Sequence, residues 1–192
     1  MTEALAHRMP WSRHVGDEAE ELLRHEWLFT NALGGYASGT VAGVCTRRYH
    51  GLLVAALPAP LGRMMMFNHV TEAFRLPNGG IVPLAGDHPR GIAQLEVATL
   101  ASFSLDFGMP VWRYDVDGYI LEKRVVMPHR ANAVHLIYRL VAGRGRIRLR
   151  MEPGLHFRPH EGPATTERFE PYHVKAAGDR FEIIAPDVPC LR

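Results

Sequence analysis

Short runs of alternating apolar and polar residues, broken at close intervals by glycine and proline, extend through most of this sequence. The clearest case is an Asp117-Gly118 step between the strand-like runs VWRY and YILEKRVV. Asp-Gly steps favour tight hairpin turns because these turns need positive φ angles. Asn78-Gly79 and Gly178-Asp179 predict two further hairpins. The pattern therefore predicts strands that pair antiparallel along much of the chain.

Helical periodicity is confined to one short acidic stretch, residues 17–24. Here Asp17 is placed to cap a helix, and Leu22 and Leu23 are placed to point inward. The remainder divides into pieces of strand length, punctuated by 14 prolines and 18 glycines across the chain. We predict an all-β fold, a large antiparallel β-sandwich with at most a short N-terminal helix.

The arginine-rich segment RGRIRLRM, residues 144–151, alternates like a strand with one basic face. That face would carry Arg144, Arg146, Arg148 and Arg150, and the other would carry Ile147, Leu149 and Met151. An anion-binding or partner-binding surface is one interpretation. We favour the other, an ordinary solvated face opposite carboxylates.

Composition and charge indicate a globular protein and give no sign of a nucleic-acid partner. The chain has 192 residues, 47% of them hydrophobic and 22% charged, which predicts one globular domain, or one domain with an extension. A net charge of +2 is too small to indicate nucleic acid as a partner.

Cys45 and Cys190 cannot form a disulfide framework or a four-cysteine zinc site. The longest apolar stretch, residues 52–61, contains two prolines and is too short to cross a bilayer. We therefore expect a cytoplasmic protein without a membrane partner.

Familiar catalytic and cofactor motifs are incomplete. The glycine-rich stretch LGGYASGTVAGV, residues 33–44, lacks the lysine of a phosphate-binding loop, so we interpret it as β structure bent by glycines. His156 and His160 are four residues apart, but Pro159 breaks the helix that would align them as metal ligands. Ser38 lies outside a nucleophile elbow. We expect no cofactor and no metal. Glycoside hydrolysis needs two carboxylates at a suitable separation. Glu72, Asp115, Asp117 and Glu122 are available, but the sequence does not give the distances between them.

The most informative cluster is TRRYHG, residues 46–51, immediately before the apolar run LLVAAL. Adjacent arginines on a strand point to opposite faces, so either Arg47 or Arg48 faces the sheet interior, a partner domain or a concave site. The aromatic and planar polar groups nearby are suited to a hydroxyl-rich ligand such as a sugar. They come from Trp27, Asn31, Tyr36, Tyr49 and His50. A buried arginine–carboxylate latch that orders the glycine-rich stretch is the alternative, and the residues alone do not separate the two.

These residues also carry a family resemblance. The segment EWLFTNALGGYASGTVAGVCTRRYHGLLVAA, residues 26–56, closely resembles the N-terminal domain of bacterial and archaeal glycogen debranching enzymes of the amylo-α-1,6-glucosidase type. FSLDFGMPVWRYDVDGYILEKRVVMPH, residues 103–129, and RIRLRMEP are similar to the same domain. The chain departs from the family pattern at Cys45 and at Ala32, which stands where a glycine is expected and which matters if the backbone there needs a positive φ.

The resemblance implies a mutarotase-like supersandwich packed against an (α/α)6 barrel, whose acidic residues hydrolyse the α-1,6-linked branch glucose. No barrel sequence is present in this chain. We therefore expect residues 1–25 to be an N-terminal extension and residues 26–192 to be the sandwich, with the catalytic barrel supplied in cis or in trans. The chain alone is expected to be inactive.

The resemblance implies a non-catalytic role at the boundary between sandwich and barrel. Contacts with an α-glucan (glycogen, limit dextrin or maltooligosaccharide) or with the barrel are expected from Asn31, Tyr36, Arg47, Arg48, Tyr49 and His50. One alternative is a stand-alone sugar-binding or mutarotase-like protein, with His50 or His69 acting beside Glu72. Another is a purely structural latch between domains.

An isolated domain of this kind should expose an apolar docking surface. The three consecutive methionines Met64, Met65 and Met66 are candidates for it, and a homodimer is one way to cover such a patch. A core strand, in which alternation buries Met65 or the other two, is the interpretation we favour.

Overall fold

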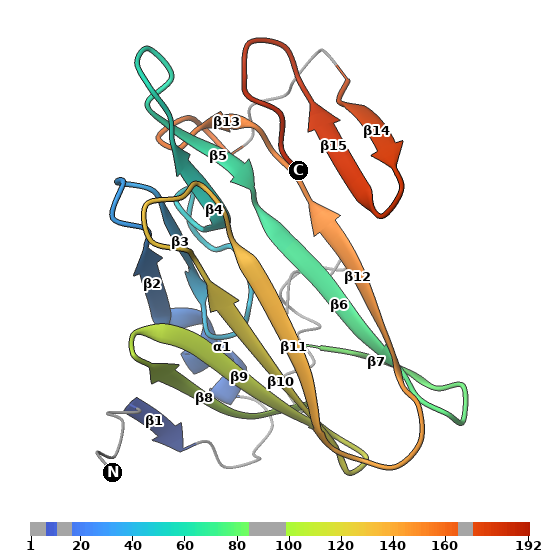
Figure 1. Cartoon of the computed structure of the whole chain (residues 1–192). Coiled ribbons are helices and arrows are strands. Elements are labelled where there is room, and N and C mark those ends of the chain that lie inside the picture. Colours follow the sequence, from blue (N-terminus) through green and yellow to red (C-terminus); the bar gives the residue numbers. More distant parts are fainter. Residues whose placement is uncertain (1–6, 11–16, 85–98, 165–170) are drawn as a thin grey trace.

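The computed structural model describes residues 7–10, 17–84, 99–164 and 171–192, with side chains described from residue 21 onward (Figure 1). Within these ranges the chain is antiparallel β structure with one α-helix, so the predicted all-β class is confirmed. No helix of the described residues is long and apolar enough to cross a membrane.

Two five-stranded sheets and one three-stranded sheet build the body of the molecule. The first sheet has the order β1 (His7–Pro10), β8 (Leu100–Asp106), β9 (Met109–Val116), β10 (Tyr119–Val126) and β11 (His135–Ala142). The second has the order β13 (Arg158–Pro159), β5 (Arg63–Phe67), β4 (Gly51–Ala56), β3 (Tyr36–Thr40) and β2 (Glu26–Thr30). The third has the order β12 (Arg148–Gly154), β6 (His69–Arg75) and β7 (Ile81–Pro83).

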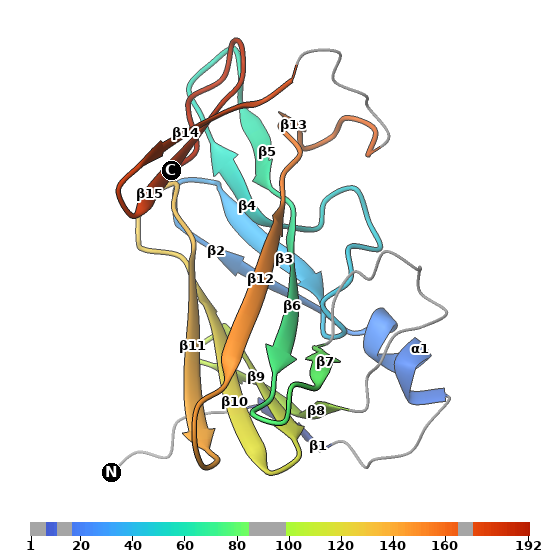
Figure 2. The same ribbon diagram turned by 90° about the vertical axis from the view of Figure 1, so that its right-hand side faces the viewer.

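A separate hairpin of β14 (His173–Ala177) and β15 (Arg180–Ile184) follows, and α1 (Asp17–Arg24) precedes β2. Only Asn68 separates β5 from β6, so one nearly continuous path leads from the second sheet into the third (Figures 1 and 2). Residues 7–10, within the predicted extension, form an edge strand that pairs with β8. The boundary at residue 25 stays a prediction.

The predicted turns and the predicted helix are confirmed. Asp117 and Gly118 have φ angles of 49° and 80° between β9 and β10, while Gly79 and Gly178 have 87° and 64° in the other two hairpins. The helix α1 spans the predicted residues, and Leu22 near its end is 2% exposed. These features depend on a few adjacent residues, which is why the sequence pattern finds them.

The first two sheets pack around a group of aromatic side chains. The Trp112 ring meets the edges of Trp27 and Phe103 at centroid distances of 5.4 and 5.1 Å. Both indoles are buried and donate to backbone carbonyls, Trp27 to Thr40 at 3.2 Å and Trp112 to Val41 at 2.8 Å. The core thus anchors the turn after β3, which leads into the TRRYHG segment.

A buried ionic cluster joins the first sheet to the third. Glu72 on β6, 1% exposed, accepts a 2.8 Å hydrogen bond from the Lys123 ammonium on β10 and another from the Tyr138 hydroxyl on β11. Lys123 also lies 5.4 Å from the ring centroid of Trp112. Burial, together with the nearby Glu72 charge, raises the pKa of Tyr138. The cluster satisfies its charges internally, which is the condition for burying them.

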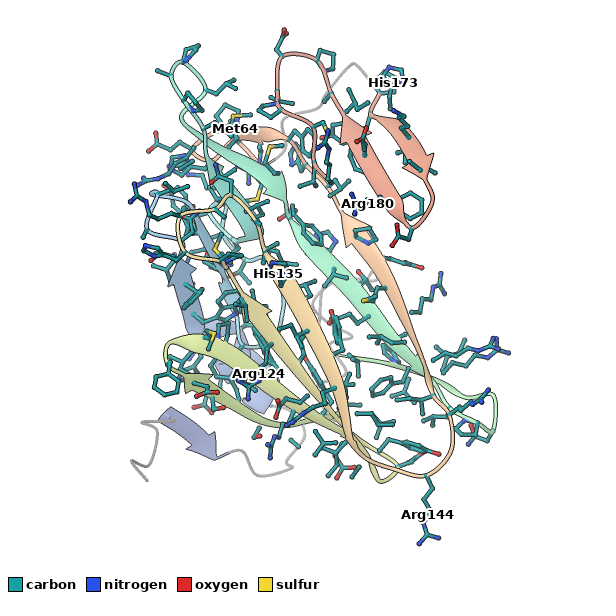
Figure 3. The ribbon with its side chains drawn as sticks, viewed as in Figure 1. Met64, Arg124, His135, Arg144, His173 and Arg180 are labelled. Carbon is teal, nitrogen blue, oxygen red and sulfur yellow. The ribbon has the colours of Figure 1, made fainter. Side chains whose placement is uncertain are left out.

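The side-chain positions distinguish between the alternative interpretations of residues 64–66 and residues 144–151 (Figure 3). Met64, Met65 and Met66 are all buried, so the core-strand interpretation holds and the predicted docking patch is wrong. Because these methionines are buried, they give no support to a homodimer. In the arginine-rich segment β12 begins only at Arg148, and the exposed Arg150 pairs with Glu152 on the same strand. This agrees with a solvated basic face.

Candidate functional site

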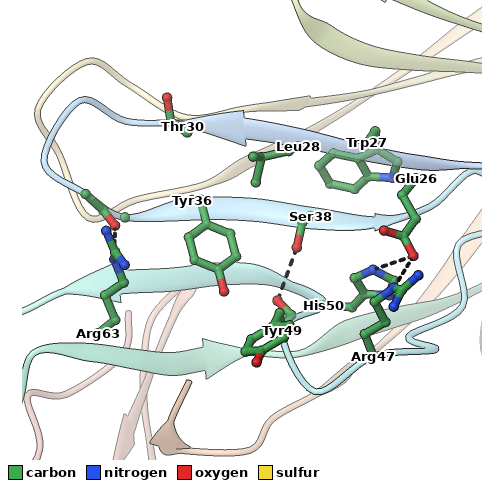
Figure 4. Close-up of a pocket in the computed structure, with 12 residues that line it drawn as sticks. Glu26, Trp27, Leu28, Thr30, Tyr36, Ser38, Arg47, Tyr49, His50 and Arg63 are labelled. Carbon is green, nitrogen blue, oxygen red and sulfur yellow. Dashed lines mark hydrogen bonds and ion pairs between the residues drawn. The ribbon is translucent and has the colours of Figure 1, made fainter. Parts of the chain in front are cut away.

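A groove of about 490 Å³ lies on the outward face of the second sheet (Figure 4). Alternation along β2 turns Trp27 and Phe29 toward the core and leaves Glu26, Leu28 and Thr30 exposed. The same alternation on β3 buries Ala37 and Gly39 and presents Tyr36 and Ser38. Charged side chains lie at both ends of the groove, Glu26 and Arg47 at one end and Arg63 at the other. The lining residues are Glu26, Trp27, Leu28, Thr30, Gly34, Gly35, Tyr36, Ser38, Arg47, Tyr49, His50 and Arg63.

An ionic group occupies one end of this groove. The Arg47 guanidinium donates to Glu26 Oε1, and His50 Nε2 lies 3.7 Å from the same oxygen. His50 Nδ1 accepts the Thr46 backbone N–H at 3.1 Å, which places the ring proton on Nε2, toward Glu26. Burial lowers the pKa of His50, and attraction by Glu26 offsets only part of that effect. The uncharged imidazole therefore points its Nε2–H toward the carboxylate at 3.7 Å, which is beyond hydrogen-bond distance.

Aromatic side chains lie between the ionic group and Arg63, as Tyr36 and Tyr49 show in Figure 4. The Tyr49 ring is 39% exposed, and the His160 ring lies 6.3 Å from Tyr49 and 6.4 Å from Tyr36 between centroids. Arg48 stacks on Tyr49, with its guanidinium carbon 4.8 Å from the ring centroid, and donates to the Tyr49 hydroxyl at 2.5 Å. Burial raises the pKa of Tyr36, so its hydroxyl remains a hydrogen-bond donor at neutral pH. Stacked rings of this kind give a rigid apolar surface with polar edges.

The rim of the groove is held from below by Asn31. This side chain is 1% exposed and accepts the backbone N–H groups of Leu33 and Gly35 at 2.9 and 3.0 Å. Gly35 has no room for a side chain, because an added Cβ would lie 2.7 Å from Asn31 Nδ2. Ala32 has a φ of 61°, so the position where the family pattern has glycine does need a left-handed backbone.

The buried arginine is Arg158 on β13, and it is neither Arg47 nor Arg48. Arg158 is 3% exposed and donates from Nη2 to the Arg48 carbonyl at 2.5 Å. Its Nη1 donates to the carbonyls of Pro159, His160 and Gly162 at 3.1 to 3.2 Å. Residues 41–50 contain no strand, so the rule that neighbours on a strand face opposite sides does not apply, and both arginines of TRRYHG are exposed. Backbone carbonyls therefore bind the buried guanidinium of Arg158, whereas the latch alternative assumed a carboxylate partner.

A comparison with protein families decides the membership of the chain. Residues 25–187 match the family model described as glycogen debranching enzyme N terminal. The chain belongs to this family. No curated protein and no solved structure matches it.

In this debranching-enzyme domain, four of the six predicted residues line one groove, namely Tyr36, Arg47, Tyr49 and His50. Arg48 stacks on the groove from outside, and Asn31 supports the rim without lining it. Glu26 and Arg63 also line the groove and were not predicted as site residues from the sequence. Alternation along EWLFT could have placed Glu26 on the outward face, whereas no local signal links Arg63 to the loop whose Gly34 carbonyl it binds at 2.6 Å.

Other carboxylates of the domain have structural partners. His69 and Glu72 are three residues apart on β6 and face opposite sides, so the structure does not bring them together as an acid–base pair. Glu122 is 3% exposed and pairs with Arg113, Arg124 and Arg139. Asp115 accepts the Gly118 N–H at 3.3 Å within the β9–β10 turn. These groups belong to the scaffold.

Proposed function

We propose that the domain contributes α-glucan contacts through the groove and packs against the α-1,6-glucosidase barrel of a debranching enzyme. The observation that carries this proposal is the combination of groups lining the groove. The exposed faces of Tyr49 and Leu28 suit the C–H faces of glucose rings, while the Glu26–Arg47 pair suits hydroxyl groups. The volume of about 490 Å³ falls in the ~300–1,000 Å³ range of small-ligand sites.

We propose a binding role without catalysis for this chain. Glycoside hydrolysis needs two carboxyl groups about 5 to 9.5 Å apart on either side of the scissile bond. Among the residues lining the groove within the described part of the chain, Glu26 is the single carboxylate. This supports hydrolysis by acidic residues of a barrel, with the present domain positioning the glucan.

We also propose that the fold is of the supersandwich type, that residues 1–25 are an N-terminal extension, and that the protein is cytoplasmic. The path from β5 into β6, which links the second and third sheets, supports the supersandwich type. The family match beginning at residue 25 supports an extension before it. A role in glycogen metabolism supports a cytoplasmic location.

Calorimetric titration of maltoheptaose and of a branched limit dextrin into the 192-residue chain tests the glucan contact. Tyr49→Ala should weaken binding about tenfold, as expected when a central aromatic contact worth ~1.4 kcal/mol is removed. Phe181→Ala, which truncates a 59% exposed ring on β15, is the matched control and should bind like the parent chain. No binding at millimolar sugar would contradict the proposal.

The same titration separates a sugar contact from an interdomain latch. Arg47→Ala removes the Glu26 pair at the end of the groove. A glucan contact predicts weaker binding by a folded variant. Unchanged affinity together with a lower free energy of unfolding would favour the latch.

A further inference from the structure

We propose that the groove binds α-glucan chains carrying phosphate monoesters, and that it binds them more tightly than neutral chains. This inference rests on the proposed function and deepens it by naming a charged class of ligand for the same groove. It is carried by the arrangement of guanidinium groups around the site.

Charge is balanced at one end of the groove. Glu26 there is paired with Arg47 and faces the Nε2–H of His50, a ring that burial keeps uncharged at neutral pH. This end offers donors and acceptors to sugar hydroxyls without a net charge.

At the other end, the described residues leave a positive charge without a carboxylate partner. Arg63 is exposed and lines the groove, and its Nε donates to the Gly34 carbonyl at 2.6 Å (Figure 4). That bond holds the guanidinium at the rim and uses one of its five donors. Within the described residues, no ion pair joins Arg63 to a carboxylate. The remaining donors can serve an anion.

Two further guanidinium groups strengthen the positive field. Arg48 stacks on Tyr49, and Arg158 binds only backbone carbonyls, so neither has a carboxylate partner among the described residues. Tyr36 lines the same groove as Arg63. Burial raises the pKa of Tyr36, whereas the charges of Arg63 and Arg158 act to lower it. Glu161, 76% exposed, lies 3.7 Å from Nε2 of His160, whose ring lies near Tyr36 and Tyr49.

A phosphate monoester on a glucose unit matches this asymmetry. The ester carries a charge of about −1.5 to −2 at pH 7, and arginine with a phenol hydroxyl supplies charge-assisted hydrogen bonds to its oxygens. The glucose rings of the same molecule would lie over Tyr49 toward the neutral Glu26–Arg47 end. A free anion would engage the arginines without the aromatic contact.

The test compares three probes by calorimetry at low salt: maltoheptaose, maltoheptaose bearing one 6-phosphate, and inorganic phosphate. The phosphorylated chain should bind about tenfold tighter than maltoheptaose, and this ratio should fall as salt is added. Arg63→Gln should bring the ratio close to one, whereas Arg63→Lys, which keeps the charge, should preserve much of it. Arg148→Gln, at an exposed strand arginine on β12, is the matched control and should leave the ratio unchanged.

Each outcome decides between the two proposals. If maltoheptaose binds and the phosphorylated chain binds no tighter, the inference is wrong and the proposed function stands. If inorganic phosphate binds as tightly as the phosphorylated chain, the site is an anion site without a glucan contact, which overturns the inference. If none of the probes binds, the proposed function fails and the inference fails with it. Circular dichroism of each variant checks that the chain is folded.

Discussion

The side-chain amide nitrogen of Asn31 donates a 2.9 Å hydrogen bond to the carbonyl oxygen of Ala131, one hundred residues further along the chain. The same nitrogen lies 3.3 Å from Asn132 Oδ1, and Asn132 in turn bonds both backbone groups of Ala56. Through these contacts the rim of the groove is tied to the loop between β10 and β11 and to the end of β4. The groove is therefore positioned by two sheets at once.

Asn31→Ala should destabilise the domain by roughly 2–4 kcal/mol, because it leaves the buried backbone N–H of Gly35 and the part-buried N–H of Leu33 without an acceptor. Urea denaturation measures the loss of free energy of unfolding. Asn78→Ala, which removes one hydrogen bond in an exposed turn, is the control and should cost less than about 1 kcal/mol. Equal losses for the two variants would contradict a central role for Asn31.

Ala32→Gly should stabilise the domain by about 0.5–1 kcal/mol, because glycine adopts the observed φ of 61° without the strain of a Cβ. The entropy that glycine loses on folding reduces this gain without cancelling it. Ala176→Gly, on the exposed strand β14, should destabilise instead. Thermal denaturation of both variants measures the two effects, and a lower Tm for Ala32→Gly would be against the prediction.

Lys123→Met should destabilise the domain by roughly 3–5 kcal/mol, because it leaves the buried Glu72 carboxylate without its cation. Combining it with Glu72→Gln should recover part of the loss, since no unpaired charge then remains in the core. Lys175→Met removes a surface pair with Glu182 at 3.9 Å and should cost less than about 1 kcal/mol. Additive losses in the double variant would argue against a coupled pair.

His50 should make stability depend on pH below neutrality. Burial lowers its pKa in the folded chain below the ordinary value of about 6.5, so the unfolded chain takes up a proton first as pH falls. Its contribution is thus complete above pH ~6.5 and is lost on acidification, at no more than about 1.4 kcal/mol per pH unit. His50→Asn, which removes the titrating ring, should flatten this part of the curve. Urea titrations of both proteins between pH 7 and 5 would show parallel curves if the prediction were wrong.

Much of the local architecture could be predicted from the sequence. The Asp117-Gly118, Asn78-Gly79 and Gly178-Asp179 turns and the helix at residues 17–24 are all present, since each depends on neighbouring residues. The family resemblance over residues 26–56 anticipated the match, and most of its predicted site residues lie at one groove. Whether they contact a glucan stays a prediction.

The rest was decided by contacts between distant segments. Alternation could not place Arg47 and Arg48, because their segment is not a strand, and it gave no reason to bury Arg158 beneath them. Met64, Met65 and Met66 are buried together because β5 is covered on both faces, which a single strand cannot reveal.

The sequence by itself determined the turns, the helix, the alternating strands and the family, because these follow from residues close together in the chain. Only the tertiary structure decided that Arg63 reaches Gly34, that Lys123 neutralises Glu72 and that Glu26 holds Arg47 and His50 at the groove. The physical reason is that charge pairing and burial depend on distance in space, and the packing of the sheets sets that distance.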